Sequence, residues 1–321
     1  MNIYDIAEKA NVSIATVSRY INKSGYVGKK TAEKIEAVIS RVGYTPSAAA
    51  KSLSKGGSFK LIGLVCCNID DLYYAKSVSV LEKRLKIYGY DIILSCTGES
   101  IEEKETSIRM LLSKNADAII FIGSVFMDGS GALLRKAAAH VPCFIINAFI
   151  SGENIYCAYC NDRLAVKETT EKLVDSGVKN PVFIYDVETY GSEKKKLGFL
   201  DAMPAGRVEK VSSDFIAACK SFEELFSKYH HDAVICSNDV LAAAALASAK
   251  KLGVSVPEKL KIVGHNNSLI SACTSPSLTS IDNGAEILSE ITADNLLKLF
   301  NGERFDSSIE INYKLIKRES F

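Results

Sequence analysis

The sequence predicts a small α-helical domain followed by an α/β core of two doubly wound parallel-sheet units. The first 45 residues carry apolar side chains at helical spacing, and from Lys60 onward short apolar runs alternate with helical stretches. Between them lies PSAAAKSLSKGGS (46–58), which is rich in small and polar residues. A chain of 321 residues has room for two or three domains, and 47% hydrophobic residues are typical of a globular protein.

Charge is distributed unevenly along the chain. Residues 1–60 contain ten Lys and Arg against four acids, a net charge of +6, whereas the whole chain carries only +1. A basic segment on a mildly acidic body is typical of a domain that contacts a polyanion. Asp5 and Glu8 interrupt any signal-peptide core, and no run of about 20 apolar residues exists, so no membrane partner is expected.

Three short helices are predicted at the N-terminus. Asn2 is placed to cap the first, Asn11 to adopt a left-handed turn, and Ser13 to cap the second. The third is predicted at about 29–42, with Gly43 ending it. The residues of the first helix expected to face inward are Tyr4, Ile6, Ala7 and Ala10.

The second helix, within VSIATVSRYIN (12–22), is predicted to be two-sided. One side carries Ile14, Val17 and Ile21 and is expected to pack on the first helix. The other carries Ala15, Ser18, Arg19 and Asn22, with Thr16 at the edge. Short polar side chains let a helix approach a DNA groove closely, and Arg19 could make a bidentate bond to guanine. The pattern therefore indicates a helix-turn-helix. The alternative is the solvated face of an ordinary small domain; the local positive charge favours DNA.

The core is predicted from near-continuous apolar runs, which are typical of strands buried on both faces of a parallel sheet. These runs are KLIGLVC (60–66), YDIILSC (90–96), AIIFIGS (118–124), CFIIN (143–147), PVFIYD (181–186), AVICSN (233–238) and KIVGH (261–265). Stretches such as 80–88 and 101–113 have helical spacing. Polar residues follow the strands, and such clusters predict a ligand crevice at the carboxyl ends of the strands. They are Asn68, Asp70, Asp71, Asn147, Asn161, Asp162, Asn238, Asp239, Asn266 and Asn267.

The motifs and residues that usually mark an enzyme active site are not found in the sequence. No glycine-rich nucleotide motif and no G-x-S-x-G elbow is present, so no cofactor is expected. The four histidines lack metal-ligand spacing, and Cys157 and Cys160 form a lone C-x-x-C without a second ligand pair. The remaining strand cysteines are interpreted as small buried hydrophobes in a reducing cytosol, namely Cys66, Cys67, Cys96, Cys143 and Cys236.

Long segments of the chain resemble one known family. IYDIAEKANVSIATVSRYIN and KTAEKIEAVISRVGYTPSAAAKSL resemble the headpiece and hinge of the LacI/GalR family of bacterial transcription regulators. PVFIYD…KKKLGF, VICSNDVLAAAALASAKKLGVSVPEKLKIVGHNN, SPSLTSID and LIKRES match later family blocks in order, so the resemblance spans nearly the whole chain. It implies a periplasmic-binding-protein-like core that closes on a small molecule. The implied domains are a headpiece (1–45), a hinge helix or linker (46–58) and a core (59–321), with an N-subdomain at about 59–158 and 285–312 and a C-subdomain at about 159–284 and 313–321.

The resemblance also implies DNA-contacting positions. Ile14 and Ala15 fall where the family chooses its operator bases, and Arg19 falls at the base-contacting arginine. The phosphate-facing positions are Ser13, Thr16, Ser18 and Asn22, and Tyr4 and Tyr26 complete the predicted headpiece contacts. Leu53 matches the hinge leucine that wedges into the minor groove of a DNA-bound dimer; the alternative is an incidental linker leucine.

Effector-contacting positions can be carried over too, and several are altered. Asn238 is retained, Lys195 replaces the family's pocket arginine, and Asn147 and Asn266 replace aspartates. The set is completed by Asn68, Tyr73 and Tyr74; core packing is the alternative for the tyrosines. Loss of two carboxylates beside Lys194–Lys196 favours an anionic effector, such as a sugar acid or sugar phosphate. The alternative is that the lysine run is mostly a solvated helix start with one Lys facing in.

These inferences predict a cytoplasmic, nucleoid-associated homodimer that binds a pseudo-palindromic double-stranded DNA operator. We expect a repressor controlled by a small carbohydrate-type effector. One alternative is control by a protein corepressor. A solute-binding protein or an enzyme on the same core is less compatible with the sequence, because the first needs an export signal and neither needs a basic helix-turn-helix.

Overall fold

A computed structural model describes residues 2–22, 24–43, 59–127 and 131–321. The chain divides into two compact units, Met1–Leu61 and Ile62–Phe321. The hinge segment 46–58, with Leu53, lies outside the described residues.

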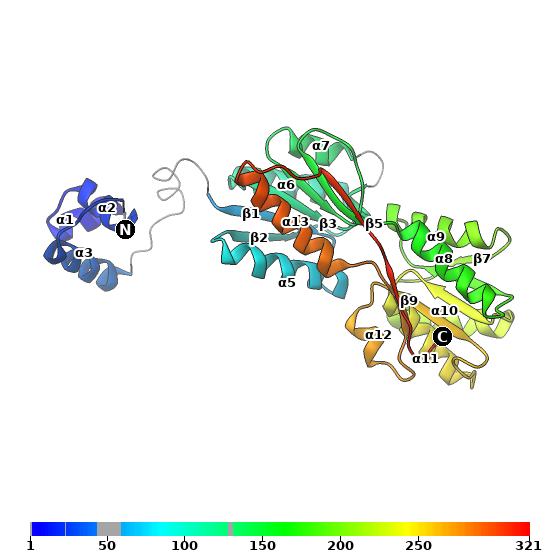
Figure 1. Cartoon of the computed structure of the whole chain (residues 1–321). Coiled ribbons are helices and arrows are strands. Elements are labelled where there is room, and N and C mark those ends of the chain that lie inside the picture. The colour runs from blue at the N-terminus through cyan, green and yellow to red at the C-terminus, as the bar shows by residue number, and fades with distance from the viewer. Residues whose placement is uncertain (1, 23, 44–58, 128–130) are drawn as a thin grey trace. The chain divides into compact units, whose positions relative to one another are not determined.

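The described residues of the first unit include the helices α1 (Ile3–Ala10), α2 (Ile14–Asn22) and α3 (Lys29–Val42) (Figure 1). Asn2 caps α1 by accepting hydrogen bonds from the backbone N–H groups of Tyr4 and Asp5, and the Asp5 carboxylate accepts one from the Asn2 N–H. Asn11 adopts the predicted left-handed conformation, with φ of 53°. The core of this unit consists of Ile6, Ala7, Ala10, Val17 and Ile35.

Two predictions about packing in this unit were wrong. Tyr4 is 64% exposed, because it lies about 160° around the helix from Ile6 and so faces away from the buried stripe. Ile14 lies on the same side as Val17 but is 41% exposed, because as the first residue of α2 it is flanked by a helical turn on one side only. Both side chains are therefore available at the surface of the unit.

The second unit contains two six-stranded sheets (Figure 1). The first has the order β11 (Ser308–Ile311), β5 (Ile155–Cys160), β4 (Cys143–Ile146), β3 (Ala118–Ile122), β1 (Leu61–Cys66) and β2 (Asp91–Cys96). The second has the order β12 (Lys314–Ile316), β10 (Thr279–Asp282), β9 (Lys261–His265), β8 (Ala233–Cys236), β6 (Pro181–Tyr185) and β7 (Arg207–Lys210). The strand pairs described are parallel, apart from β10 with β12. The predicted α/β architecture of two doubly wound sheets is confirmed.

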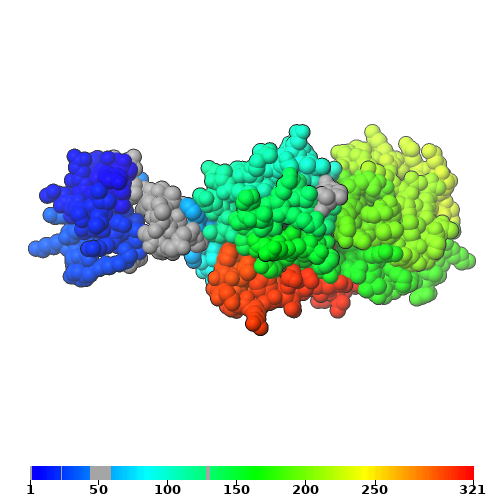
Figure 2. Space-filling model, turned by 90° about the horizontal axis from the view of Figure 1, so that it is seen from above, coloured from blue at the N-terminus to red at the C-terminus, as the bar shows by residue number. Residues whose placement is uncertain are grey.

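Helices cover both faces of the first sheet. The helices are α5 (Leu72–Ile87), α6 (Ile101–Ser113), α7 (Ala132–Ala138) and α13 (Ala285–Phe300), with a short 3₁₀ turn, η1, at Ser124–Met127. Alternate residues of each strand enter opposite cores: Ile120 packs with α5 and α13, and its neighbour Phe121 packs with α6 and α7. Figure 2 shows α13, in orange, lying along this subdomain.

The second sheet is covered in the same way. Its helices are α8 (Asp162–Asp175), α9 (Tyr190–Ala202), α10 (Phe215–Lys228), α11 (Asp239–Lys251) and the short α12 (Leu269–Cys273). α10 and α11 pack on one face and α8 and α9 on the other. α8 and α9 approach closely at Gly198, where a Cβ atom would lie 2.1 Å from the carbonyl oxygen of Arg163. A glycine is needed there for the two helices to touch.

The chain passes between the two sheets three times: after β5, between β10 and α13, and between β11 and β12. These crossings place the carboxyl ends of β1 and β4 opposite those of β6, β8 and β9. The polar clusters predicted to follow the strands therefore face one another across a cleft.

Some strands differ from their predicted form. β2 is an edge strand with no fully buried residue, because it has a neighbour on only one side. As a result Cys96 is exposed, and Cys67 is half-buried just after β1, so the prediction that these two are buried was wrong. β5, β7, β10, β11 and β12 were not predicted. Segments such as RVEK and SIEI lack a continuous apolar run, whereas IYCAYC in β5 is such a run and was overlooked.

Candidate DNA interface and ligand cleft

Most of the described residues predicted to contact DNA are exposed or half-buried and lie on or beside α2. Ser13, Ala15 and Arg19 are exposed with Ile14 on α2, and Thr16, Ser18 and Asn22 are half-buried. The Ser13 hydroxyl caps α2 by accepting a hydrogen bond from the Thr16 N–H at 3.2 Å. Tyr26, after α2, is 92% exposed. Leu53 lies outside the described residues.

Three adjoining hollows occupy the cleft of the second unit. The central hollow has a volume of about 100 Å³. It shares Asp71, Asp186 and Asn238 with a second hollow of about 420 Å³, which we call the acidic hollow. It shares Asn147, Asp162 and Gly191 with a third of about 290 Å³, which we call the aromatic hollow.

The structure places all seven predicted effector residues at these hollows. Six of them line the central hollow: Tyr73, Tyr74, Asn147, Lys195, Asn238 and Asn266. Asn68 lines the acidic hollow, where its side-chain oxygen accepts a hydrogen bond from the Asp71 N–H. The residues come from loops after β1, β4, β8 and β9, from the first turn of α5 and from α9, so the fold brings together positions that are far apart in sequence.

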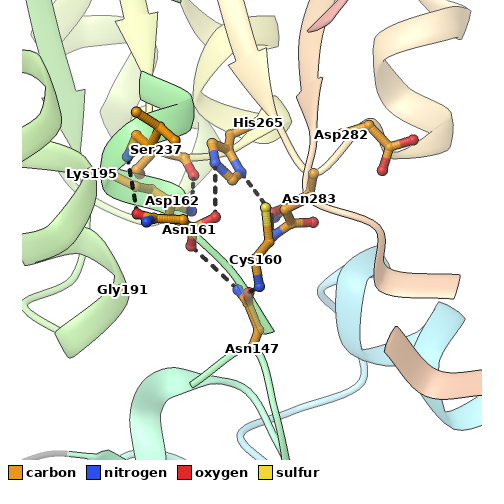
Figure 3. A network of polar contacts seen from close by, with 12 residues as sticks. Asn147, Cys160, Asn161, Asp162, Gly191, Lys195, Ser237, His265, Asp282 and Asn283 are labelled. Atoms are coloured by element: carbon orange, nitrogen blue, oxygen red, sulfur yellow. Dashed lines mark hydrogen bonds and ion pairs between the residues drawn. The ribbon is translucent and has the colours of Figure 1, made fainter. Parts of the chain in front are cut away.

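Asp162 is the centre of a buried polar network (Figure 3). Its carboxylate accepts a hydrogen bond from the Asn147 side chain at 3.3 Å and lies 3.4 Å from Nε2 of the fully buried His265. Burial raises the pKa of Asp162, but the charges of His265 and Lys195 and hydrogen bonds from His265 and Asn147 outweigh it and hold the pKa below its ordinary value. Asp162 is therefore a charged anchor for the floor of the cleft.

The amides that replace family aspartates hold this floor together. Asn147 and Asn266 both adopt positive φ, 62° and 88°, a conformation that asparagine tolerates better than most residues. Asn266 Oδ1 lies 3.0 Å from His265 Nδ1 and accepts a hydrogen bond from the Asn283 side chain. Backbone conformation and network contacts thus explain both amides without reference to the charge of a ligand.

The lysine run does not make the cleft basic. Lys195 is buried, and its Nζ donates to the Ser237 carbonyl oxygen at 2.9 Å. Lys194 lies over the Tyr190 ring beside the aromatic hollow, and Lys196 pairs with Glu193. One lysine of the three lines the central hollow.

Three carboxylates of the central hollow were missing from the predicted effector set: Asp162, described above, and Asp71 and Asp186. Asp71 caps α5 by accepting from the Tyr73 N–H at 2.8 Å, and Asp186 follows β6 and accepts from Asn238 at 3.0 Å. Burial raises the pKa of Asp71, as does the charge of Asp186, while the Tyr73 hydrogen bond and Lys195 lower it. Asp71 belonged to a recognised post-strand polar cluster, and Asp186 ended a predicted strand run, so their positions were signals that could have found them.

Tyr73 and Tyr74, from the first turn of α5, line the central hollow. Their rings meet edge to face with centroids 5.6 Å apart. The Tyr73 side chain is only 6% exposed, and its hydroxyl has no hydrogen-bond partner among the described residues. Such a buried donor is costly unless a ligand or water accepts from it. Tyr74 is accommodated by Gly123, where a Cβ atom would lie 2.7 Å from the ring.

The described part of the chain also bears on metal sites, reactive cysteines and membrane-spanning helices. It contains no cluster of three or more His, Cys, Asp or Glu residues that could hold a metal ion. Cys157 and Cys160 lie in β5, and burial raises the pKa of both thiols, that of Cys160 to about 12. None of the described helices has the length and apolar character needed to cross a membrane.

Comparison with known proteins gives the family. Residues 2–47 match the bacterial regulatory proteins of the lacI family, and residues 170–321 match the periplasmic binding protein-like domain. An HTH-type transcriptional regulator of Lachnoclostridium phytofermentans is 35% identical, over 100% of this chain and 99% of the relative. The chain belongs to the LacI family of bacterial transcriptional regulators.

Solved structures of LacI-family regulators share its fold. The lac repressor dimer bound to operator and the anti-inducer ONPF matches with a TM-score of 0.84 at 21% identity, covering 100% of this chain and 98% of the other. A periplasmic binding protein/LacI transcriptional regulator from Alkaliphilus metalliredigens QYMF, complexed with D-xylulofuranose, matches with a TM-score of 0.70 at 26% identity, covering 81% and 98%.

Proposed function

We propose that this LacI-family regulator is a homodimeric repressor, without enzymatic activity, that binds a pseudo-palindromic operator in the bacterial cytoplasm and is controlled by a neutral carbohydrate in the cleft. The observation that carries the proposal is the pairing of an exposed, acid-free α2 surface with a cleft whose floor is already charge-balanced and whose free groups are suited to hydroxyls. The sequence-derived boundaries at 45, 58 and 158, and the minor-groove role of Leu53, are part of this proposal.

The proposed DNA interface is the exposed side of α2. Arg19 supplies a guanidinium for a guanine edge, and Ser13 and Thr16 supply short hydroxyls for phosphates. Ile14 and Ala15 provide apolar contacts of the kind that thymine methyl groups receive. The lac repressor structure, a dimer on its operator, supports the same use of the headpiece in a dimer here.

The charge of the cleft argues for a neutral effector over the sugar acid or sugar phosphate that the sequence favoured. Asp71 and Asp186 are the carboxylates of the central hollow not held by the His265 network, whereas the ammonium of Lys195 is already engaged. Each carboxylate can accept two hydroxyl protons, and the unpartnered Tyr73 hydroxyl can donate to a sugar oxygen. The D-xylulofuranose bound by the Alkaliphilus protein supports this ligand class.

The proposal is tested by a gel shift with the purified full chain on its own promoter region. A panel of neutral sugars and their acid and 6-phosphate counterparts is added at equal concentration. We expect a specific complex whose affinity changes at least tenfold with a neutral sugar, because a ligand that prefers one subdomain arrangement shifts the equilibrium by its differential affinity, about 1.4 kcal/mol per tenfold.

The outcomes separate the alternatives. A response confined to the acid or phosphate member would contradict the neutral-effector proposal. DNA binding that appears only when a cell extract is added would favour a protein corepressor. Absence of a specific complex under all conditions would contradict the assignment of the promoter as the operator-bearing DNA.

A further inference from the structure

The three hollows differ in charge, and the central one joins the other two. The described residues that line the acidic hollow include five carboxylates, Asp70, Asp71, Glu99, Asp186 and Asp239, and no Lys or Arg. The aromatic hollow is lined by three aromatic rings together with Arg163 and Lys194. The outer hollows have no described lining residue in common, whereas each shares residues with the central hollow, so a ligand in the central hollow can extend toward either side.

The central hollow is small for a complete ligand. Its volume of about 100 Å³ lies below the roughly 300–1,000 Å³ that ligand sites usually provide. A ligand larger than this hollow that contacts Asp71, Asp186 and Tyr73 would therefore continue into a neighbouring hollow. The shared residues Asn147, Asp162 and Gly191 make the aromatic hollow directly continuous with the centre.

Three rings form what we call the aromatic shelf: Phe149, Tyr159 and Tyr190. Phe149 follows β4 and is 44% exposed, and its ring centroid lies 5.5 Å from that of Tyr159 on β5. Tyr190 is the first residue of α9 and belongs to the other sheet's subdomain. A ligand on the shelf would therefore contact both subdomains.

The two positively charged side chains of the aromatic hollow are already engaged, whereas the Phe149 ring is not covered by a charged group of the described residues. Lys194 lies over the Tyr190 ring at 5.0 Å, and the guanidinium of Arg163 is held by both carboxylate oxygens of Asp201 at 2.6 and 2.8 Å. Phe149 has no such cover from a charged group in the described cation–ring contacts. An exposed phenylalanine beside a polar cleft suits a partner with an apolar face and a polar rim, as a sugar ring has.

We propose that the aromatic shelf is a second sugar subsite, so that the effector is an oligosaccharide of at least two units with one unit in the central hollow and the next stacked on Phe149. This rests on the proposed function, because it assumes that the cleft binds carbohydrate. Contact of the second unit with Tyr190 ties it to both subdomains and makes closure depend on ligand length.

The chain contains no tryptophan, which provides a direct reporter. In the variant Phe149→Trp the emission comes from the shelf alone. The matched control is Tyr229→Trp, since Tyr229 is a half-exposed ring at the end of α10, just before β8 and so at the opposite end of the sheet from the cleft. Both variants are titrated with gluco-, xylo-, manno- and galacto-saccharides of one, two and three units.

We expect a saccharide of two or three units to change the Phe149→Trp emission and leave the Tyr229→Trp emission unchanged. The monosaccharide of the same series, followed by thermal shift, should bind without the emission change. In Phe149→Ala, which removes the stacking ring from an exposed site, the longer saccharide should lose at least tenfold in affinity and the monosaccharide less than twofold.

Failure of this inference differs from failure of the proposed function. If thermal shifts show saccharide binding but the Phe149→Trp emission stays constant, or if Phe149→Ala binds all lengths as the native chain does, the second subsite is wrong and the carbohydrate proposal stands. If no saccharide of any length produces a thermal shift or an emission change, the carbohydrate proposal is wrong and the shelf proposal with it.

Discussion

The α2 surface and the cleft floor are built in opposite ways. On α2, the exposed side chains of Ala15 and Arg19 pack little against the rest of their unit and can be changed at small cost to folding. In the cleft, Asp162, His265 and Lys195 are buried and their contacts are made within the protein: Asp162 lies 3.4 Å from His265, and Lys195 donates to the Ser237 carbonyl oxygen. The first surface is free to bind a partner that is added later, whereas the second must be complete before any ligand arrives.

This difference teaches where function and stability are separable. A substitution on α2 should change DNA affinity and leave the core unaffected. A substitution in the cleft floor should change stability first, and ligand binding as a consequence. The predictions that follow test this separation, beginning with the largest effect.

Replacing Asp162 by alanine should destabilise the core by about 3–5 kcal/mol, because it leaves buried positive charge without its partner. Urea denaturation followed by circular dichroism measures the change. Asp201→Ala is the matched control: Asp201 pairs with Arg163 at the surface, where a salt bridge contributes at most about 1 kcal/mol. Equal losses in the two variants would contradict the role of the buried network.

Asp162 should also leave a pH signature. Its folded pKa lies below the ordinary 3.8, so its contribution is fully present above that pH and is lost as pH falls through the folded value. The stability difference between the native chain and Asp162→Asn should therefore shrink as the pH falls below about 4. A difference that grows on acidification would have the wrong sign.

Replacing Arg19 by alanine should weaken the specific promoter complex by about 1–3 kcal/mol, the value of a bidentate contact to a base, with no change in thermal unfolding of the core. A salt-dependent gel shift measures the affinity. Arg41→Ala, in the last turn of α3, is the control for loss of one exposed positive charge. If both variants weaken specific and nonspecific DNA equally, Arg19 contributes charge alone.

Asp71→Asn should give the smallest effect and the opposite pH trend. Its folded pKa is raised, so the charged form costs stability at neutral pH, and removing the charge should stabilise the core by less than about 1 kcal/mol. Asparagine caps a helix as well as aspartate does, so α5 keeps its cap. The gain in Tm should be largest at pH 7 and vanish below about pH 4. A lower Tm of Asp71→Asn at pH 7 would contradict the view that the Asp71 charge costs stability.

Local patterns made the fold and the headpiece predictable. The caps at Asn2 and Gly43, the bounds of α3, and seven apolar runs that became strands all follow from short-range spacing. Edge strands such as β7 and β11 escaped prediction, because their pairing comes from distant neighbours and not from their own composition.

The sequence predicted which positions line the cleft, but not the contacts and charges of their side chains. Positions after strands identified its lining, yet whether Lys195 is free or engaged depends on the Ser237 carbonyl 42 residues away. Asn147 and Asn266 were interpreted from the sequence only as replacements for two charged aspartates. Nothing in the sequence indicated that both residues adopt a left-handed backbone conformation, which the turn imposes. Phe149 gave no signal at all, since its exposure arises only from the way β4 and β5 lie together.

The most direct test of the account is fluorescence anisotropy of labelled promoter DNA titrated with the full chain, with and without the saccharide selected by thermal shift. The account predicts that the saccharide changes the DNA affinity of the native chain at least tenfold, and that the change is lost in Asp71→Asn/Asp186→Asn while DNA binding without the saccharide is retained. An affinity that the bound saccharide leaves unchanged would contradict the coupling of the cleft to the DNA-binding unit.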